Sequence, residues 1–461
     1  MTIFTRKMIN PSIRYYDCTH EGCKAYDFAE LSRLVDAYKN LFLSKGAKKN
    51  AKVVIGSQAS VSQIAMVMAC SELGMTVIII GTPFSGNRYI PGKINTKLKL
   101  MLPIDFFILN SRDETDKFNA FQDTCRFTIV IDEEVLDYTP NNEVVAEPDT
   151  VLIQCTTSGT TETPKVIEHT HSFITALITR NSTRFSGSMG MISNLAHGSS
   201  LAVYFLPGLV SPGVTTFVNL PHEPLKNTRF DVIRQLDINL EHLLFPYTLQ
   251  IDELFNSELR MPECTVYTLG LIRKSWVEKV KSGYAKNVVS LFGTNETSGP
   301  IFDNQALDDD FSENSYKLID DFYQVSIDEQ NDLTVEVPIY STVVKTHDLF
   351  LKRNDRFVHV GRSNLFRVND LAVDVAKHQA EIDKISNASL VVDTRQDLIY
   401  LAIWDKNTTD QTIKYIDQML LNDSSGIHRI NRYAFLNYDD YLNGIKIDQE
   451  MLRQYFRENH T

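Results

Sequence analysis

The chain has 461 residues, of which 43% are apolar, enough for roughly two to four domains with a full-sized hydrophobic core. Its net charge is −12 and its lysines and arginines are scattered, which argues against nucleic acid as the main partner. No run approaches the roughly 20 apolar residues of a membrane span, and a signal-peptide core is absent, so we expect a cytoplasmic protein without a membrane span.

The six cysteines are dispersed, and most lie in or beside apolar runs, which predicts reduced thiols. One local cluster, Cys18-Thr-His20-Glu-Gly-Cys23, holds half the ligands of a zinc site. No second Cys/His pair follows at ligand spacing, so a metal is the less favoured interpretation.

The first third of the chain alternates between helical and strand patterns. The expected elements are a helix at residues 27 to about 43, a strand at 52–55, a helix at 61–73, and strands at 76–80, 104–109 and 127–131 with a helix near 115–123 between the last two. Strand, helix and strand at this spacing form a βαβ unit with parallel pairing and a right-handed crossover.

A hydroxyl-rich segment follows the strand expected at residues 151–154. It reads Cys155-Thr-Thr-Ser-Gly-Thr-Thr-Glu-Thr-Pro-Lys165, and a helix is expected from residue 172 to about 180. Its backbone N–H groups, hydroxyls and ammonium are the groups that bind phosphate oxygens. It is not a Walker loop, because G-x-x-x-x-G-K-[ST] is absent. On composition alone, a polar surface loop is the alternative.

A second α/β series follows, and its last strand leads into another polar turn. Strands are expected at residues 191–195, 215–218, 242–245, 265–269 and 287–292. The turn reads Phe292-Gly-Thr-Asn-Glu-Thr-Ser-Gly-Pro300. Ligands of open α/β sheets lie beyond the carboxyl ends of the strands, which makes this turn a candidate for binding.

Beyond Asp303, short alternating strands at 324–327, 333–337 and 340–344 predict an antiparallel or barrel-like piece. Thr346-His-Asp348 and Phe357-Val-His-Val-Gly-Arg362 follow it, and the carboxylate of Asp348 is suited to accept two hydroxyl bonds at once. Near the end, Leu442-Asn-Gly-Ile-Lys-Ile-Asp448 precedes a helical pattern at 451–456.

These segments, in this order, resemble the motifs of the ANL superfamily of adenylate-forming enzymes: acyl- and aryl-CoA synthetases, luciferases and peptide-synthetase adenylation domains. The family forms are [ST]-S-G-[ST]-T-G-x-P-K-G, Y-G-x-T-E, T-G-D, G-R and a terminal N-G-K-[IV]-D. The chain departs from them with Glu162 and Val166 for glycine, Asn295 for threonine, and one extra residue before Lys446.

The resemblance implies an α/β fold: a large N-terminal domain of two α/β subdomains plus a small barrel-like β piece, then a small mobile α+β C-terminal domain. The adenylation domain would span residues 1–362, the hinge 363–364 and the mobile domain 365–461. Asn364 stands at the hinge position, where Asp or Lys is commoner. Asp370 stands where the family usually has a glycine against the pantetheine chain.

The implied reaction is in-line attack of a substrate carboxylate on the α-phosphorus of Mg·ATP, which gives an acyl-adenylate and pyrophosphate. The acyl group then passes to a thiol of CoA or of carrier-protein phosphopantetheine. The implied ATP- and phosphate-binding residues are Thr157, Ser158, Gly159, Thr160, Thr161 and Lys165. The implied nucleotide-binding residues are Gly270, Phe292, Gly293, Thr294, Asp348 and Arg362, with Glu296 and Thr161 for Mg²⁺. Lys446 is the implied catalytic lysine, and His197 would line the path to the carboxylate.

The partner implied is a small carboxylic acid, with a carrier protein as a further one. The F-D-x-S tract of α-amino-acid adenylation domains is absent, which disfavours an α-amino acid, and the sequence does not name the acid. Two alternatives stay open. One is an amide-forming ligase that passes the acyl group to an amine. The other is a degenerate, nucleotide-binding pseudoenzyme, because Glu162 brings a carboxylate close to where phosphates would lie.

Overall fold

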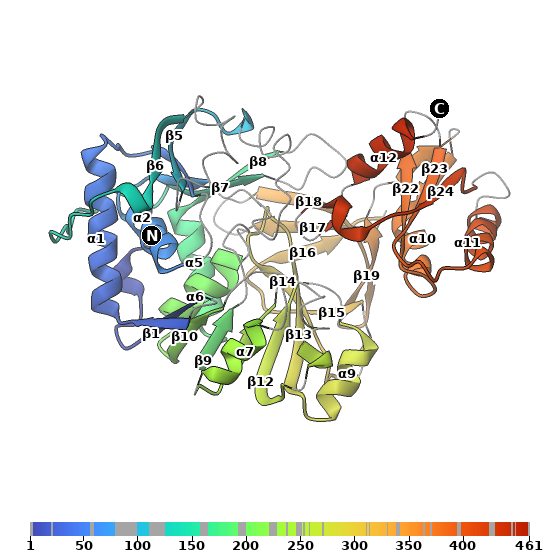
Figure 1. Cartoon of the computed structure of the whole chain (residues 1–461), viewed down its shortest axis with the longest axis horizontal. Helices are drawn as coiled ribbons and strands as arrows, with labels where there is room; N and C mark the ends of the chain where they lie inside the picture. Colours follow the sequence, from blue (N-terminus) through green and yellow to red (C-terminus); the bar gives the residue numbers. More distant parts are fainter. Residues whose placement is uncertain are drawn as a thin grey trace. The chain divides into compact units, whose positions relative to one another are not determined.

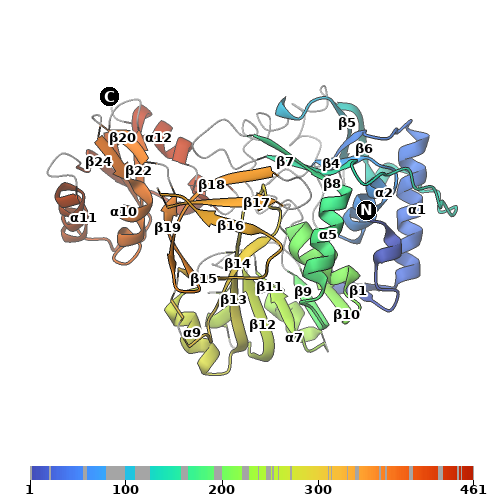
Figure 2. The ribbon, with the colours of Figure 1, turned by 180° about the vertical axis from the view of Figure 1, so that it is seen from behind.

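The structure of the chain is a computed structural model, shown from two sides in Figures 1 and 2. It describes residues 3–19, 22–55, 60–78, 99–109, 125–156, 165–191, 200–220, 228–236, 238–245, 251, 254–257, 259–269, 272–309, 311–312, 314–329, 331–337, 342–362, 365–368, 371–393, 398–423, 429–443, 446–447 and 449–459.

The chain divides into two units, which are described separately below. The first unit consists of Met1–Gly159, Thr163–Tyr323 and Val337–Thr342, and the second of Thr160–Glu162, Gln324–Glu336 and Val343–Thr461.

One sheet of the first unit is built from the strands expected in the first third of the chain. In spatial order its described strands are β6 (Cys125–Val130), β5 (Ile104–Leu109), β3 (Lys52–Ile55), β4 (Thr76–Ile78), β7 (Val151–Thr156) and β8 (Val166–Thr170). The first five are parallel, which confirms the βαβ prediction, and β8 is antiparallel to β7. Strand β8 was not predicted, and the helix expected near 115–123 lies outside the described residues.

Two expected helices lie side by side at the blue end of the chain in both views. Helix α1 (Phe28–Ser44) begins at a capping box, in which Asp27 accepts from the Glu30 N–H and the Glu30 side chain accepts from the Asp27 N–H. Helix α2 (Val61–Glu72) ends before Gly74, whose φ of +65° is readily adopted only by glycine. Short 3-10 turns cover Arg6–Met8 (η1) and Ile131–Glu133 (η3).

A larger sheet carries the second α/β series. Its strands in the first unit are, in spatial order, β15 (Ser315–Leu318), β14 (Pro300–Gln305), β13 (Ala285–Gly293), β12 (Met261–Thr268), β11 (His242–Leu244), β9 (Gly187–Met191), β10 (Val214–Asn219), β1 (Arg14–Thr19) and β2 (Gly22–Tyr26). The strands from β13 to β1 are parallel, and β14, β15 and β2 are antiparallel to their neighbours. Of the strand expected at 191–195, Met191 is the last residue of β9, and residues 192–195 lie outside the described ones.

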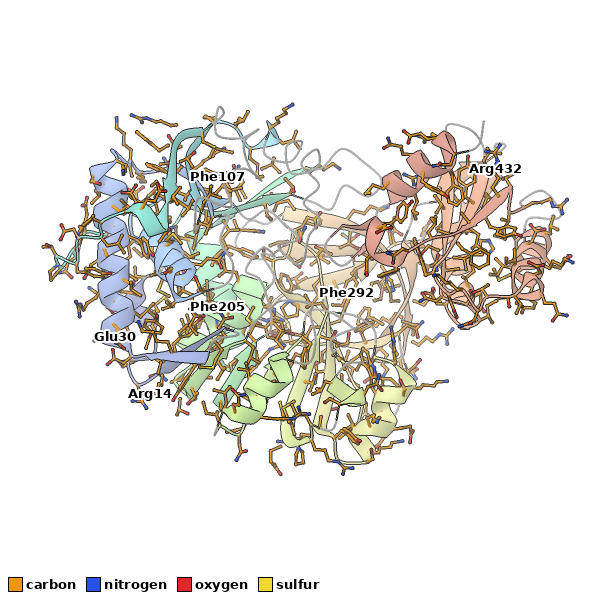
Figure 3. The ribbon with its side chains drawn as sticks, viewed as in Figure 1. Arg14, Glu30, Phe107, Phe205, Phe292 and Arg432 are labelled. Atoms are coloured by element: carbon orange, nitrogen blue, oxygen red, sulfur yellow. A yellow bond between two sulfur atoms is a disulfide. The ribbon has the colours of Figure 1, made fainter. Side chains whose placement is uncertain are left out.

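Helices cover both faces of this larger sheet. On one face, α7 (Thr228–Gln235) and α9 (Lys274–Lys281) share a core with the apolar residues of the parallel strands. The opposite face is covered by α5 (His171–Ser182), the π-helical turn η4 (Ser200–Phe205) and α6 (Leu206–Val210). There Phe205, labelled in Figure 3, packs edge-on against Phe217 of β10 with ring centroids 5.0 Å apart.

The second unit begins with the short strands that the sequence predicted. Neighbouring strands are β16 (Gln324–Ile327), β17 (Asp332–Val337), β18 (Thr342–Arg353) and β19 (Arg356–Arg362). The pairs β16–β17 and β18–β19 are antiparallel, which confirms the expected change of pattern. A hairpin of β20 (Leu365–Val368) and β21 (Leu371–Asp374) follows.

The end of the chain is an α+β layer structure. Its sheet contains β22 (Ala388–Asp393), β23 (Leu398–Ile403) and β24 (Arg432–Phe435). Helices α10 (Val375–Ile382) and α11 (Asp410–Asp423) pack on one face, and α12 (Gln449–Glu458) packs on the other, as Figure 1 shows. The turn η5 (Tyr438–Tyr441) leads into a small hairpin of β25 (Leu442–Asn443) and β26 (Lys446–Ile447).

The expectation of reduced cysteines is wrong for one pair. Cys18 and Cys23 are direct partners across the β1–β2 hairpin and form a disulfide. The strand register brings these two residues together, and the pairing removes both thiolates that a zinc site would need. The other four cysteines, Cys70, Cys125, Cys155 and Cys264, are free thiols.

The fold class is therefore α/β, with parallel sheets first and smaller antiparallel and α+β pieces after them, as the sequence predicted. Among the described residues, no helix is both long and apolar enough to cross a membrane.

Candidate functional site

The hydroxyl-rich loop connects two paired strands. Strand β7 ends at Thr156 and β8 begins at Val166, and these two residues are partners in the register, so the intervening loop is closed at its base. Lys165 directly precedes β8 and is exposed. The other predicted phosphate-binding residues, Thr157, Ser158, Gly159, Thr160 and Thr161, lie outside the described residues, as does Glu162.

One departure from the family pattern has a packing explanation. Val166 stands where the family has glycine, and its side chain packs against the core cluster that contains Val54, Ile78 and Phe107. A β-branched residue suits a strand, and β8 starts at this position. Where the family has a flexible glycine at the end of the loop, this chain has Val166, which begins β8 and packs into the core.

The second motif forms a turn that its own threonine ties together. Thr297 is fully buried, and its hydroxyl lies 3.0 Å from the carbonyl oxygen of Thr294 and 2.9 Å from that of Gly299. The N–H of Thr294 donates back to the same hydroxyl at 3.1 Å. Tyr323 donates from its hydroxyl to the Thr297 carbonyl at 2.8 Å. The turn that carries Glu296 is thus fixed at its buried side.

Both glycines of this turn lie close to other atoms, and at Gly293 the contact is with the backbone. A Cβ on Gly293 would lie 2.3 Å from the carbonyl oxygen of Gly299, and a Cβ on Gly299 would lie 2.5 Å from Leu177 of α5. Phe292, the last side chain before the turn, is labelled in Figure 3, and its ring lies 6.1 Å from that of Phe302 and 5.9 Å from that of Tyr316. The end of β13 is therefore held by the rings of Phe302 and Tyr316 and by the close contact of Gly293 with Gly299.

Two hydrogen bonds join this turn to the base of the hydroxyl-rich loop. The side-chain amide of Asn295 donates to the carbonyl oxygen of Thr156 at 3.0 Å. The ring of His169, on β8, contacts the carbonyl oxygen of Asn295 through Nε2 at 3.0 Å. Asn295 is the departure from threonine in the second motif, and its amide links the two motifs directly.

The state of His169 follows from its surroundings. A carbonyl oxygen only accepts hydrogen bonds, so Nε2 carries the proton. The ring is 1% exposed and stacks on Phe173 with centroids 5.2 Å apart, and burial lowers the pKa of His169 to about 4. At neutral pH it is an uncharged donor. Its Nδ1 is buried and has no hydrogen-bond partner among the described residues.

Glu296, the predicted magnesium ligand, is half-buried in the turn directly after Asn295. Among the residues that the structure describes, its carboxylate makes no hydrogen bond or ion pair. No described residue therefore donates a hydrogen bond to the carboxylate oxygens of Glu296. Their charge and position suit a cation bound together with phosphate groups.

The second unit holds the third motif. Asp348 on β18 is 5% exposed, and its N–H donates to the Thr346 hydroxyl at 3.2 Å. Thr346 in turn donates to the carbonyl oxygen of Leu333 on β17 at 3.0 Å. In the register, Asp348 is opposite Arg362 of β19, so the two predicted nucleotide-binding positions are cross-strand partners. The side chain of Arg362 lies outside what the structure describes.

The predicted catalytic lysine lies on a small hairpin. Lys446 is the first residue of β26 and is paired with Asn443 of β25. The connecting residues 444–445 include the extra residue before the lysine, and they lie outside the described ones, as does the Lys446 side chain. His197, Gly270, the hinge position Asn364 and the departure Asp370 also lie outside the described residues.

The sequence did not single out His169 or predict β8. The strand reads Val166-Ile-Glu-His-Thr170, and its polar centre hides the period-2 pattern of a half-buried strand. One polar pair joins β7 to β8. Gln154 of β7 donates to Glu168 of β8 at 2.8 Å, and this polar pair matches the register.

Similar solved structures cover nearly the whole chain. ATP-bound MatB from Rhodopseudomonas palustris is 13% identical with a TM-score of 0.74, and 98% of this chain and 97% of that chain are covered. O-succinylbenzoate coenzyme A synthetase (MenE) from Bacillus subtilis, in complex with ATP and magnesium ion, is 15% identical with a TM-score of 0.72 and coverages of 93% and 95%. McyG A-PCP complexed with phenylalanyl-adenylate is 14% identical with a TM-score of 0.72 and coverages of 99% and 96%.

No curated protein sequence is significantly similar to the chain. At identities this low, the structural similarity establishes the fold alone, which is that of these three proteins. The sequence profile of the family described as AMP-binding enzyme matches residues 10–332, more than half of the chain. With this match the resemblance noted in the sequence is confirmed, and the chain belongs to the family of AMP-binding enzymes.

Proposed function

We propose that the chain is an AMP-forming ligase. It activates a carboxylic acid with Mg·ATP to an acyl-adenylate and pyrophosphate, and then transfers the acyl group to a thiol of CoA or of a carrier protein. The observation that carries this proposal is the pair of hydrogen bonds through Asn295, which holds the Glu296 turn against Thr156 at the start of the hydroxyl-rich loop.

In this proposal the loop residues 157–161 and Lys165 hold the β- and γ-phosphates through N–H, hydroxyl and ammonium groups. Phe292 packs beside the adenine, near Gly270, Gly293 and Thr294. Asp348 accepts hydrogen bonds from the ribose hydroxyls, and its burial on β18, opposite Arg362 in the strand register, supports a carboxylate that is held in one place. In this proposal all of these residues bind the nucleotide, and none of them forms a covalent bond with it.

Mg²⁺ fits the residues present. Magnesium in nucleotide sites is usually held by one or two carboxylates together with phosphates and water, and the Glu296 carboxylate is not used by other described residues. Glu296, with Thr161, would hold it. When bound, the ion neutralises phosphate charge. The solved complex of MenE with ATP and magnesium ion supports magnesium as the metal.

Positioning and charge stabilisation are most of what a displacement at phosphorus needs. Lys446 would contact the carboxylate and the α-phosphate as charge develops between them, and His197 would line the path of the acid. We propose the adenylation domain at residues 1–362, the hinge at 363–364 and the mobile domain at 365–461. The end of β19 at Arg362 and the start of β20 at Leu365 support that boundary.

The partner in this proposal is a small carboxylic acid, and the A-PCP structure of McyG supports a carrier protein as a further one. A cytoplasmic location is part of the proposal, although the Cys18–Cys23 disulfide is more typical of oxidising compartments. An amine as acceptor and a pseudoenzyme without turnover are the alternatives that the experiments separate.

The test is exchange of labelled pyrophosphate into ATP, with Mg²⁺ and a panel of carboxylic acids. The expected result is exchange with at least one acid. Clear binding of ATP without exchange for any acid contradicts the proposal and favours the pseudoenzyme. Glu296→Gln serves as the matched variant, because it keeps the size of the side chain and removes the charge that would hold the metal.

A further inference from the structure

A buried arginine on α5 joins three segments that are distant from one another in the sequence. The side chain of Arg180 is 8% exposed, and its Nε and Nη2 donate to the two carboxylate oxygens of Asp320 at 2.7 Å each. Its Nη1 donates to the carbonyl oxygen of Pro300 at 2.9 Å. Asp320 and Pro300 lie 140 and 120 positions from Arg180. One guanidinium therefore connects α5, the start of β14 and the segment after β15.

Two aromatic rings and a backbone N–H fix the orientation of this guanidinium. Its central carbon lies 4.8 Å from the ring centroid of Phe322 and 5.1 Å from that of Tyr323. The two rings pack edge-on, with centroids 4.9 Å apart. The N–H of Phe322 donates to Oδ1 of Asp320 at 3.1 Å, so the carboxylate is held as well. Aromatic faces and a bidentate carboxylate each stabilise and orient an arginine.

Arg180 and its neighbour Tyr323 both bind the turn that carries Glu296. Pro300 is the first residue of β14, directly after the turn, and as a proline it has a carbonyl but no N–H to offer. Arg180 binds that carbonyl, and the hydroxyl of Tyr323 donates to the carbonyl oxygen of Thr297 at 2.8 Å. The turn is therefore attached to α5 and to the segment after β15 at two of its carbonyl groups.

Helix α5 also links this attachment to the hydroxyl-rich loop. The helix directly follows β8, and its N-cap is Thr170, the last residue of that strand. Strand β8 closes the base of the loop by pairing with β7. A Cβ on Gly299 would lie 2.5 Å from Leu177, one helical turn before Arg180, so the helix and the turn are in close contact. Arg180 thus holds the turn against the helix that begins at the return strand of the loop.

We propose that Arg180 is a positioning residue for the magnesium site. It acts through the turn, because it holds the backbone that carries Glu296 in one place relative to the hydroxyl-rich loop. The site requires an arginine, since the single ammonium of a lysine lacks the planar fork that binds both carboxylate oxygens and a carbonyl at once. This inference rests on the proposed role of Glu296 as a magnesium ligand, and it adds a residue that lies outside every motif of the sequence.

The first experiment measures binding of ATP by calorimetry, in EDTA and at increasing Mg²⁺ concentration. Arg180→Ala should need about 10-fold more Mg²⁺ than wild type for half of the metal-dependent gain in affinity, because residues that orient a metal ligand have effects of about this size. The affinity for ATP in EDTA should stay the same. Arg180→Lys should lie between the two proteins. It also carries the test if circular dichroism shows that Arg180→Ala is unfolded.

The second experiment reads the position of the turn without nucleotide or metal. Hydrogen–deuterium exchange is followed by mass spectrometry on peptides that cover residues 293–300. In wild type the N–H of Ser298 donates to the carbonyl oxygen of Thr294 at 3.0 Å, inside the turn. Arg180→Ala should exchange faster in these peptides, because the turn loses its attachment to α5, and peptides of the sheet formed by β3 to β6 should not change.

Arg184→Ala is the matched control. Arg184 lies one helical turn after Arg180, and its Nη2 is 3.9 Å from Oδ2 of Asp320. Among the residues that the structure describes, it makes no hydrogen bond to the Glu296 turn. Its removal takes a positive charge from the same carboxylate and leaves the bond to Pro300 in place. The Mg²⁺ dependence of ATP binding and the exchange of residues 293–300 should both remain as in wild type.

A double variant shows whether Arg180 acts through Glu296. Glu296→Gln should itself weaken the response of ATP binding to Mg²⁺, and adding Arg180→Ala should then change that response no further. Additive losses overturn the positioning role. So does an equal loss of ATP affinity with and without Mg²⁺ in Arg180→Ala, because that is the result of a general structural defect.

Failure of the proposed function gives a different result. Wild type that binds ATP with a response to Mg²⁺, but exchanges pyrophosphate with no acid, contradicts the proposed function and leaves the role of Arg180 to be decided by the same calorimetry. A wild-type response to Mg²⁺ that Arg180→Ala leaves unchanged overturns the inference alone. If ATP binding to wild type does not respond to Mg²⁺, the proposed role of Glu296 and this inference fall together.

Discussion

The ring of His169 donates a hydrogen bond from Nε2 to the carbonyl oxygen of Asn295, 126 positions away in the sequence. The side-chain amide of Asn295 in turn donates to the carbonyl oxygen of Thr156 at the end of β7. The strand that leads into the hydroxyl-rich loop and the turn that carries Glu296 are therefore held by the same two residues.

The first prediction tests this connection. His169→Phe keeps a ring to stack on Phe173 but removes the donor, so the Asn295 carbonyl loses its partner. We expect the free energy of unfolding in urea to fall by about 1–3 kcal/mol. Pyrophosphate exchange should fall as well, because the Glu296 turn is no longer held against the loop.

His171→Phe is the control for that variant. The His171 ring is also fully buried, but neither of its nitrogens has a hydrogen-bond partner among the described residues. Its replacement loses no hydrogen bond, so stability and exchange should change much less than in His169→Phe. Equal effects of the two variants would mean that ring packing, and not the bond to Asn295, stabilises this region.

The second prediction concerns pH. Burial lowers the pKa of both His169 and His171 from 6.5 to about 4. Between these values the unfolded chain binds protons that the folded chain excludes, so the contribution of each neutral histidine to stability is full above pH 6.5. It is lost progressively as the pH falls toward 4. For His169 the loss amounts to about 3 kcal/mol at most.

Urea unfolding of wild type and His169→Phe at pH 7, 5.5 and 4.5 provides the measurement. All other titrating groups are common to both proteins, so the difference between the two curves isolates His169. The gap should narrow as the pH falls, because wild type alone carries this penalty. A gap independent of pH would contradict the assignment of a neutral, buried imidazole.

Local sequence patterns were sufficient to predict much of the fold. Strands β3 and β5 are mostly apolar, and α1 carries both helical periodicity and a capping box. The strand that leads into the second motif, expected at residues 287–292, is present as β13. In each case the information lies within about a dozen neighbouring residues.

Features that depend on the exact register between strands, or on strands that the sequence did not predict, could not be foreseen. The Cys18–Cys23 disulfide follows from the register of a hairpin whose strands were not expected. The contact of His359 with Asp348 needs the irregular register of β18 with β19, and the bond from His169 needs β8, whose polar centre conceals it. Each depends on which residues tertiary structure places opposite one another, and this is not encoded in local periodicity.

The third prediction separates catalysis from binding. Lys446→Ala should lower the rate of adenylation by about 10²-fold or more, since one well-placed charge is worth roughly 3 kcal/mol in a transition state. The affinity for ATP should change little. Lys414→Ala, an exposed lysine on α11, is the control and should behave as wild type. Wild-type rates for Lys446→Ala would show that the extra residue before it has displaced the catalytic role to another lysine.

The last prediction concerns the acceptor of the acyl group. Enzymes of this family that use CoA or a carrier protein bring a small-domain loop against the pantetheine arm, and a glycine there permits close approach of the backbone. In the proposed alignment, Asp370 would add a Cβ and a negative charge at the matching position, and Asn364 would stand at the proposed hinge. We predict a thiol acceptor, with the Asp370 side chain as an obstacle that the pantetheine chain must pass.

The measurement starts from a preformed acyl-adenylate, to which CoA, a phosphopantetheinyl carrier protein and a set of amines are offered in parallel. A thiol acceptor gives AMP and a new thioester, and Asp370→Gly should then be as fast as wild type or faster, because the substitution removes bulk and charge from the path. Asp370→Asn separates the two causes, since it keeps the bulk and removes only the charge. If only an amine discharges the adenylate, the chain is an amide-forming ligase, and the aspartate lies on a path that no pantetheine arm uses.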